Sequence, residues 1–164
     1  MLIRRDDLRG PEVAALLEEH LADMYAASPA ESVHALDLDG LRRPEITFWT
    51  IWDSGLLVGC GALKELDQTH GEIKSMRTVA THRGRGVASA MMTHILEQAE
   101  RRGYRRLSLE TGVEDFFHAA RQLYAKFGFV ATEPFADYWA DPNSYFMTKE
   151  LAPTVTTNRS NPEA

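Results

Sequence analysis

The sequence of 164 residues contains a single cysteine, Cys60, and fewer basic than acidic side chains, 18 against 24. One thiol cannot form an intramolecular disulfide and excludes a cysteine-based metal cluster, so a reducing cytoplasm is the expected setting. The formal net charge of −6 argues against general affinity for nucleic acid. We therefore expect a cytoplasmic protein with no nucleic-acid partner.

Long apolar runs are also missing. No segment approaches the ~20 apolar residues that span a bilayer, and the charged segment 1–9 lacks the apolar core of a signal peptide. The apolar fraction of 44% and the charged fraction of 26% are typical of globular domains. We predict one domain over residues 1–151, no membrane partner, and a flexible C-terminal tail over residues 152–164 that is rich in Pro, Thr and Asn.

Hydrophobic periodicity divides the domain into alternating strands and helices. Strands are predicted over Leu2–Arg5, Ile46–Trp52, Leu56–Leu66, Glu72–Val79, Arg106–Glu110, Phe129–Thr132 and Tyr145–Leu151. Helices are predicted from Pro11 to Ser28, over Val87–Arg101 and over Asp115–Phe127, with mixed short pieces over residues 31–44. Short turns join the three consecutive strands in the middle of the chain, so we expect these strands to be antiparallel.

Two arginines and two glycines, in the run Arg83-Gly84-Arg85-Gly86-Val87-Ala88, lie between a predicted strand and a predicted helix. Free N–H groups at a helix N-terminus and the helix dipole favour an anion, and glycine lets a phosphate approach the main chain. The sequence therefore predicts a site for a phosphorylated ligand at this turn.

A dinucleotide-binding fingerprint is the alternative interpretation of the same glycines, because Gly84-x-Gly86-x-x-Ser89 is followed by a strand-terminal acid, Glu110. That fingerprint requires a parallel βαβ unit and a glycine or alanine in place of Ser89. The strands before this turn are predicted to be antiparallel, and the Lys-Ser/Thr pair of a P-loop is missing as well. Both nucleotide-fold interpretations are therefore weak.

Two motifs resemble those of the GNAT N-acetyltransferases. Residues 83–88 match the signature (Arg/Gln)-x-x-Gly-x-(Gly/Ala), and Leu123-Tyr124-Ala125-Lys126-Phe127-Gly128-Phe129 is similar to the segment that joins the last helix of the family to its sixth strand. The resemblance implies an α/β (α+β) fold with a central, mostly antiparallel mixed sheet of six to seven strands. It also implies about four flanking helices and a splay between the fourth and fifth strands.

The resemblance further implies acetyl-CoA as the acetyl donor, with no metal. In the family, main-chain amides of the glycine turn hold the pyrophosphate, arginines add charge, and the fourth strand pairs with the pantetheine arm. Carried over to this chain, the cofactor-binding residues are Met76, Arg77, Thr78, Arg83, Gly84, Arg85, Gly86, Val87 and Ala88.

Three side chains compete for the catalytic roles that amine attack on a thioester requires. Tyr124 matches the family tyrosine near the sulfur, and a phenol with a pKa near 10 suits protonation of a leaving thiolate. Glu72 and Glu110 are rival general bases on the fourth and fifth strands. The alternatives are a core aromatic for Tyr124 and, for Glu72, a solvated strand residue paired across the sheet with a lysine.

The acceptor side is expected from the variable first third and from the connection between strands six and seven, because the family binds amines there. Candidate substrate-binding residues in the first third are Tyr25, Glu31, Ser32 and His34. Phe135, Tyr138 and Trp139 lie in the other connection. Phe117 departs from the family, which often has a CoA-binding asparagine seven residues before the tyrosine.

The predicted function is N-acetylation of a primary amine of a small metabolite by direct attack in a ternary complex. The alternatives are acetylation of a protein N-terminus or lysine, and a non-catalytic acyl-CoA-binding module that regulates a partner. A homodimer is an expectation from the family alone.

Overall fold

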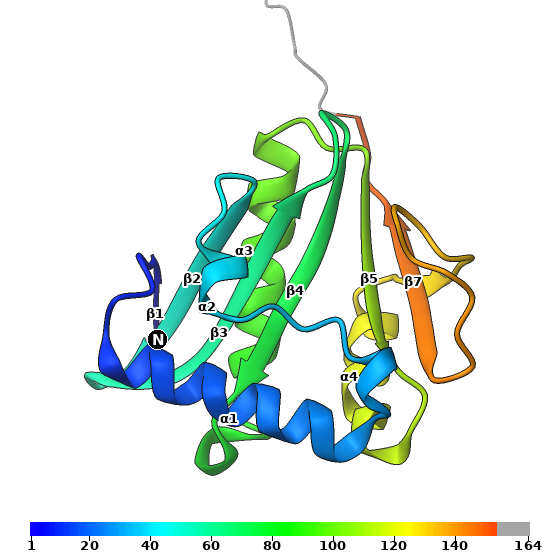
Figure 1. The fold of residues 1–164 in the computed structure, drawn as a ribbon. Coiled ribbons are helices and arrows are strands. Elements are labelled where there is room, and N and C mark those ends of the chain that lie inside the picture. The colour runs from blue at the N-terminus through cyan, green and yellow to red at the C-terminus, as the bar shows by residue number, and fades with distance from the viewer. Residues whose placement is uncertain (154–164) are drawn as a thin grey trace, which may run out of the picture.

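A computed structural model describes residues 1–153, which form one seven-stranded sheet with helices on both faces (Figure 1). The strands are β1 (Leu2–Arg5), β2 (Ile46–Asp53), β3 (Leu56–Glu65), β4 (His70–Thr78), β5 (Arg106–Gly112), β6 (Val130–Ala131) and β7 (Ser144–Glu150). The helices are α1 (Pro11–Ala27), α2 (Leu38–Leu41), α3 (Val87–Arg101) and α4 (His118–Lys126), with single 3-10 turns η1 (Ala30–Ser32), η2 (Ala80–His82) and η3 (Asp115–Phe117).

The sheet has the order β1-β2-β3-β4-β5-β7-β6, and β4 and β5 form its one parallel pair. Helices α1 and α2 cover one face, and α3 and α4 cover the other (Figure 1). The predicted mixed, mostly antiparallel sheet of six to seven strands with about four helices is therefore confirmed. The antiparallel pairing of the three middle strands, β2, β3 and β4, is confirmed as well.

Most predicted elements match in position to within one residue, and four differ. Strand β5 continues to Gly112, two residues beyond its predicted end. Strand β4 begins at His70, two residues before the predicted start, because it pairs with β5 there. The helix predicted over Asp115–Phe127 is divided into η3 and α4, and the buried Phe117 ends the first piece. Strand β6 has only two residues, which pair with β7. The tail predicted from Ala152 onward lies, except for its first two residues, outside the described part of the chain.

Two apolar clusters hold the layers together. Under α3, residues one helical turn apart, Val87, Met91 and Ile95, are almost fully buried against the sheet. On the opposite face, α1 buries Val13 and Leu17 in a second cluster. Burial of apolar area at about 25 cal/mol per Å² on both faces fixes the positions of α1 and α3 relative to the sheet.

Strand β4 has two features that create the site. Its parallel pairing with β5 stops at Glu72, so the rest of β4 has a hydrogen-bonded neighbour only on its β3 side. A bulge follows, because Gly61 of β3 faces both Ser75 and Met76, and Ser75 has a φ of 54°. An extra residue in a strand reverses the alternation of side chains beyond it. Arg77 consequently points to the same face as Lys74.

Candidate active site

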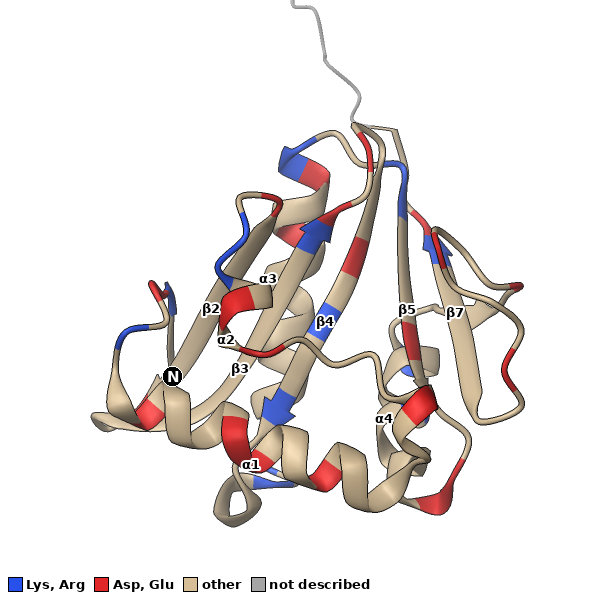
Figure 2. Ribbon diagram, viewed as in Figure 1, with Lys and Arg blue, Asp and Glu red and all other residues tan. Residues whose placement is uncertain are grey.

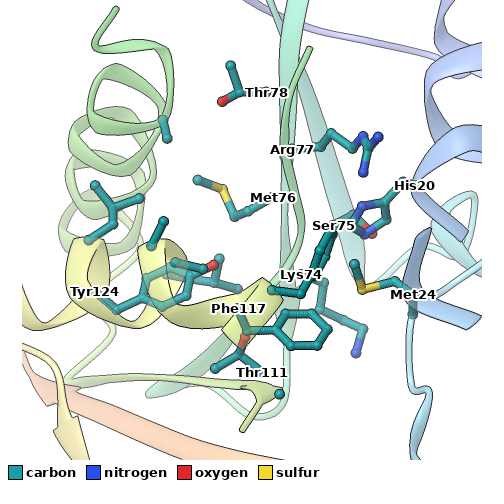
Figure 3. A pocket seen from close by; sticks show the side chains of 18 of the residues that line it. His20, Met24, Lys74, Ser75, Met76, Arg77, Thr78, Thr111, Phe117 and Tyr124 are labelled. Carbon is teal, nitrogen blue, oxygen red and sulfur yellow. The ribbon is translucent and has the colours of Figure 1, made fainter. Parts of the chain in front are cut away.

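A cavity of about 600 Å³ lies where β4 and β5 diverge (Figure 3). Its lining comes from α1 and the segment after it, from β4 and β5, from the glycine turn and first turn of α3, and from η3 and α4. The predicted splay between the fourth and fifth strands therefore produces a site that several helices and strands reach at once. The glycine turn before α3 and the segment that follows α1 both contribute to the lining.

The glycine turn before α3 is open. Gly84 and Gly86 have φ of 75° and 83°, in the left-handed region that glycine tolerates best, and a Cβ on either would meet no atom within 4 Å. Helix α3 begins at Val87, and the first N–H groups of a helix have no partner within it. Amides of this turn are therefore free to bind an anion, as the predicted phosphate site requires.

Most of the predicted cofactor-binding residues line this cavity: Met76, Thr78, Arg83, Gly84, Gly86, Val87 and Ala88, together with Arg77. Arg85 is exposed and is not part of the lining. The guanidinium of Arg77 turns away toward α1, where it contacts Asp23 at 2.6 Å and Glu19 at 3.1 Å. Figure 2 shows acidic positions along α1 where the helix passes the end of β4. Arg77 thus offers only its backbone to a ligand between β4 and β5, and its side chain lies on the α1 side of β4.

Glu110 and Tyr124 both line the cavity, from β5 and α4. Burial, reinforced by the nearby charge of Glu72, raises the pKa of Glu110 to about 7. Burial and the charge of Glu110 raise the pKa of Tyr124 to about 12. The phenol also contacts Phe129 in the core, so Tyr124 is both a packed aromatic and a lining residue with its hydroxyl toward the cavity (Figure 3).

Glu72 is buried rather than solvated. Only 3% of its side chain is exposed, and its carboxylate accepts hydrogen bonds from the hydroxyl of Tyr138 at 2.5 Å and from Nζ of Lys74 at 3.2 Å. Lys74 also donates to Tyr138 at 3.1 Å. Glu72 was expected to pair with a lysine across the sheet, but its partner Lys74 lies two residues along the same strand. Pairing of Glu72 with Tyr138, 66 residues away, carried no signal in the sequence.

The two segments predicted to form the acceptor side do meet. Ser32 donates a hydrogen bond of 2.6 Å to Asp141, and the ring of His34 packs edge-on against those of Tyr138 and Trp139. Ser32 and His34 line the cavity.

Tyr25 and Glu31, the other two predicted substrate-binding residues, are exposed and lie outside the lining. Sequence reasoning also missed His20, which α1 places in the cavity wall beside Arg77. A histidine on the apolar stripe of α1, between Leu17 and Met24, was the one signal for it.

Among residues 1–153, no three His, Cys, Asp or Glu side chains are grouped so that they could hold a metal ion. Within the same residues no helix is both long and apolar enough to cross a membrane.

Comparison with known proteins decides the family. A sequence profile described as the Acetyltransferase (GNAT) family matches residues 13–129. The chain belongs to the GNAT acetyltransferase family. It is 60% identical over 151 residues, 92% of this chain and 100% of the relative, to the uncharacterized N-acetyltransferase YsnE of Bacillus subtilis. It is 40% identical over 154 residues, 91% of this chain and 97% of the relative, to the IAA acetyltransferase of Azospirillum brasilense.

Solved structures agree on the fold of this GNAT protein. A GNAT acetyltransferase of Elizabethkingia anophelis with acetyl-CoA bound superposes with a TM-score of 0.63 at 17% identity, covering 92% of this chain and 97% of the other. The family predicted from the two motifs and the enzyme class, an acetyltransferase, are thereby confirmed.

Proposed function

We propose that this GNAT protein transfers the acetyl group of acetyl-CoA to the primary amine of a small metabolite, by direct attack within a ternary complex. The observation that carries the proposal is a single cavity in which an open glycine turn, an unpaired stretch of β4, a carboxyl of raised pKa and a tyrosine hydroxyl meet. The name of the Bacillus subtilis relative and the acetyl-CoA in the Elizabethkingia anophelis structure support it.

The donor half of the cavity fits coenzyme A. Amides of residues 84–88 and the positive end of the α3 dipole would hold the pyrophosphate, and Arg83 would add a charge-assisted contact. Backbone groups of β4 beyond Glu72 have no partner on the β5 side, so residues 76–78 would pair with the pantetheine arm. Because these contacts use the main chain, the rotation of the Arg77 side chain toward α1 does not disturb them.

Glu110 is the better base of the two rivals. A general base works best when its pKa lies near the working pH, and the pKa of Glu110 is raised to about 7. Glu72 is held by hydrogen bonds from Tyr138 and Lys74, which limit its movement. We assign Glu110 to proton removal and Glu72 to holding Tyr138 of the connection between β6 and β7.

When bound, acetyl-CoA supplies the thioester carbonyl carbon that the amine nitrogen attacks. A nitrogen–carbon bond forms, the carbon–sulfur bond breaks, and Glu110 takes the proton that the nitrogen loses. The hydroxyl of Tyr124 donates a hydrogen bond to the departing sulfur. A thiol has a pKa near 8.5, below that of Tyr124 and above that of Glu110. The proton held by Glu110 can therefore pass downhill to the thiolate, with Tyr124 as the donor in contact.

A small acceptor fits better than a protein segment. The connection between β6 and β7 is fastened beside the cavity by two part-buried hydrogen bonds, from Ser32 to Asp141 and from Tyr138 to Glu72. A peptide that approached from this side would have to displace them. Ser32 and His34 would contact the acceptor, whereas Tyr25 and Glu31 are too exposed for that role.

The test is the release of free thiol when the purified full chain is incubated with acetyl-CoA and a panel of primary amines, with acetylated product identified by mass spectrometry. We expect turnover with a subset of small amines. Binding of CoA without turnover on any amine or lysine peptide would favour a non-catalytic acyl-CoA-binding module, and turnover confined to peptides would favour a protein acetyltransferase.

A further inference from the structure

Three buried polar atoms of residues that line the cavity have no hydrogen-bond partner within residues 1–153. They are Nδ1 of His20, Oγ of Ser75 and Nε of Arg77. All three residues line the cavity, and His20 and Arg77 are more than nine-tenths buried. An unpaired buried polar group loses its hydrogen bonds to water without replacement, so native proteins rarely leave several together. Such a group of atoms indicates a bound molecule.

The fold brings these atoms to one place for identifiable reasons. The bulge at Ser75 puts both Ser75 and Arg77 on the α1 side of β4, and Figure 3 shows them beside His20. Arg77 is fixed there by Asp23, which follows His20 by three residues and therefore shares its helical face. His20 is close enough to Arg77 for the guanidinium charge to lower its pKa further, after burial.

Charge decides which chemical group fits. The guanidinium of Arg77 is already matched by the carboxylates of Asp23 and Glu19, and His20 is neutral because burial lowers its pKa to about 4. The subsite therefore has no spare positive charge with which to repay the desolvation of an anion. A neutral group suffers no such penalty.

Hydrogen-bond capacity narrows the choice further. Nε of Arg77 can only donate, the Ser75 hydroxyl can donate or accept, and neutral His20 can present a lone pair at Nδ1. One hydroxyl group satisfies all three, because its oxygen accepts from Arg77 and Ser75 while its hydrogen is donated to His20. A carbonyl oxygen would leave the His20 lone pair unmatched.

We propose that His20, Ser75 and Arg77 form a hydroxyl-binding subsite, so that the acceptor is a primary amine that also carries a hydroxyl group. The inference rests on the proposed function, since the same cavity holds Glu110 and Tyr124. An acceptor bound at the subsite by its hydroxyl would extend toward Glu110 with its amine.

The test compares amines of equal size with and without a hydroxyl: ethanolamine with propylamine, propanolamine with butylamine, and pentanolamine with hexylamine. Both kcat/KM and the Kd for the CoA-loaded protein are measured. A built site rejects an analogue that lacks the expected hydroxyl, so we expect at least one pair to differ by about tenfold or more in favour of the hydroxylated amine.

Variants connect that preference to the subsite. In Ser75→Ala and His20→Phe, the ratio of kcat/KM between the hydroxylated amine and its partner of equal size should fall toward one. Ser28 lines the same cavity outside the subsite, so Ser28→Ala should keep the wild-type ratio. Thermal melting confirms that each variant is folded. Two outcomes would overturn the subsite. Equal kcat/KM and Kd values within every pair would assign the three atoms to an internal water. A stronger preference for γ-aminobutyrate than for the hydroxylated amines would assign them to a carboxylate. If no amine is acetylated, the proposed function fails, and the Kd ratios still decide the subsite.

Discussion

The hydroxyl of Tyr138 donates a 2.5 Å hydrogen bond to the carboxylate of Glu72, which ties the connection between β6 and β7 to the buried part of β4. Lys74 donates to both partners, so the three side chains form one closed unit at the wall of the acceptor side. The unit fixes the connection between β6 and β7 beside the cavity and places Glu72 near Glu110.

Tyr138→Phe should therefore weaken the acceptor side while leaving the donor side intact. Loss of a hydrogen bond to a charged group costs about 1.5–3 kcal/mol, so we expect a fall of that order in the free energy of unfolding. The KM for the amine should rise severalfold, and the Kd for CoA should stay within twofold. Denaturant unfolding and calorimetry measure these quantities. If the Kd for CoA rose as much as the KM for the amine, the acceptor side and the donor side would not be independent.

Glu110→Gln tests the assignment of the base. The base must be deprotonated to act, so turnover of the wild type should rise with pH through about 7 and then level off. The variant should lose about two orders of magnitude in turnover, together with this rise near pH 7. Glu97→Gln, on the exposed face of α3, is the control. If Glu110→Gln kept the wild-type pH profile, the role would pass to Glu72 or to a water.

The same substitution, Glu110→Gln, should lower turnover but raise the free energy of unfolding above pH 7. The pKa of Glu110 is raised from 4.5 to about 7 by folding, so the folded state binds more protons than the unfolded state between those values. The wild type therefore loses stability as pH rises from about 4.5 to about 7, and Glu110→Gln should not. At pH 8 the variant should be more stable by up to about 3 kcal/mol, a difference that vanishes at pH 4. Urea titrations measure this difference. If burial did not destabilise the charged carboxylate, the variant and the wild type would differ by the same free energy of unfolding at pH 8 and at pH 4.

Tyr124→Phe should lower turnover about a hundredfold with little change in the Kd for CoA, because the hydroxyl acts on charge that develops at the sulfur during the reaction. Tyr104→Phe supplies the matched control, since its hydroxyl bonds Glu65 and it does not line the cavity. Steady-state assays and calorimetry with CoA give the two values. Unchanged turnover would leave Tyr124 as a packing residue only.

Gly86→Glu should abolish CoA binding without unfolding the protein. Its side chain would extend into open space, and its carboxylate would occupy the end of α3 where a phosphate is expected. Gly86→Ala is the control, because it carries the same strain at a φ of 83°, about 1–2 kcal/mol, without the charge. Of the two variants, calorimetry should find CoA binding only in Gly86→Ala. Normal affinity in the Glu variant would remove the pyrophosphate from this turn.

Local patterns predicted the elements well where one physical preference dominated. Helix α3 occupies the predicted range because apolar residues at helical spacing lie between a glycine turn and Gly103. The helix predicted over Asp115–Phe127 was wrong at its start, because Phe117 is buried beside Gly112 in a way that no spacing reveals. Likewise, the segment of Ser32 and the connection between β6 and β7 were expected on the same side of the molecule, but the contact of Ser32 with Asp141 depends on how these two long connections pack.

The sequence by itself determined the order of elements, the open glycine turn and the family, because these depend on residues that are neighbours along the chain. Only the tertiary structure decided which carboxyl has a raised pKa and which residues line the cavity. Desolvation of Glu110 and the unpaired atoms of His20, Ser75 and Arg77 arise from the bulge in β4, the divergence of β4 and β5 and the position of α1. Burial is a property of what surrounds a group in space, and residues far apart in the sequence supply those surroundings.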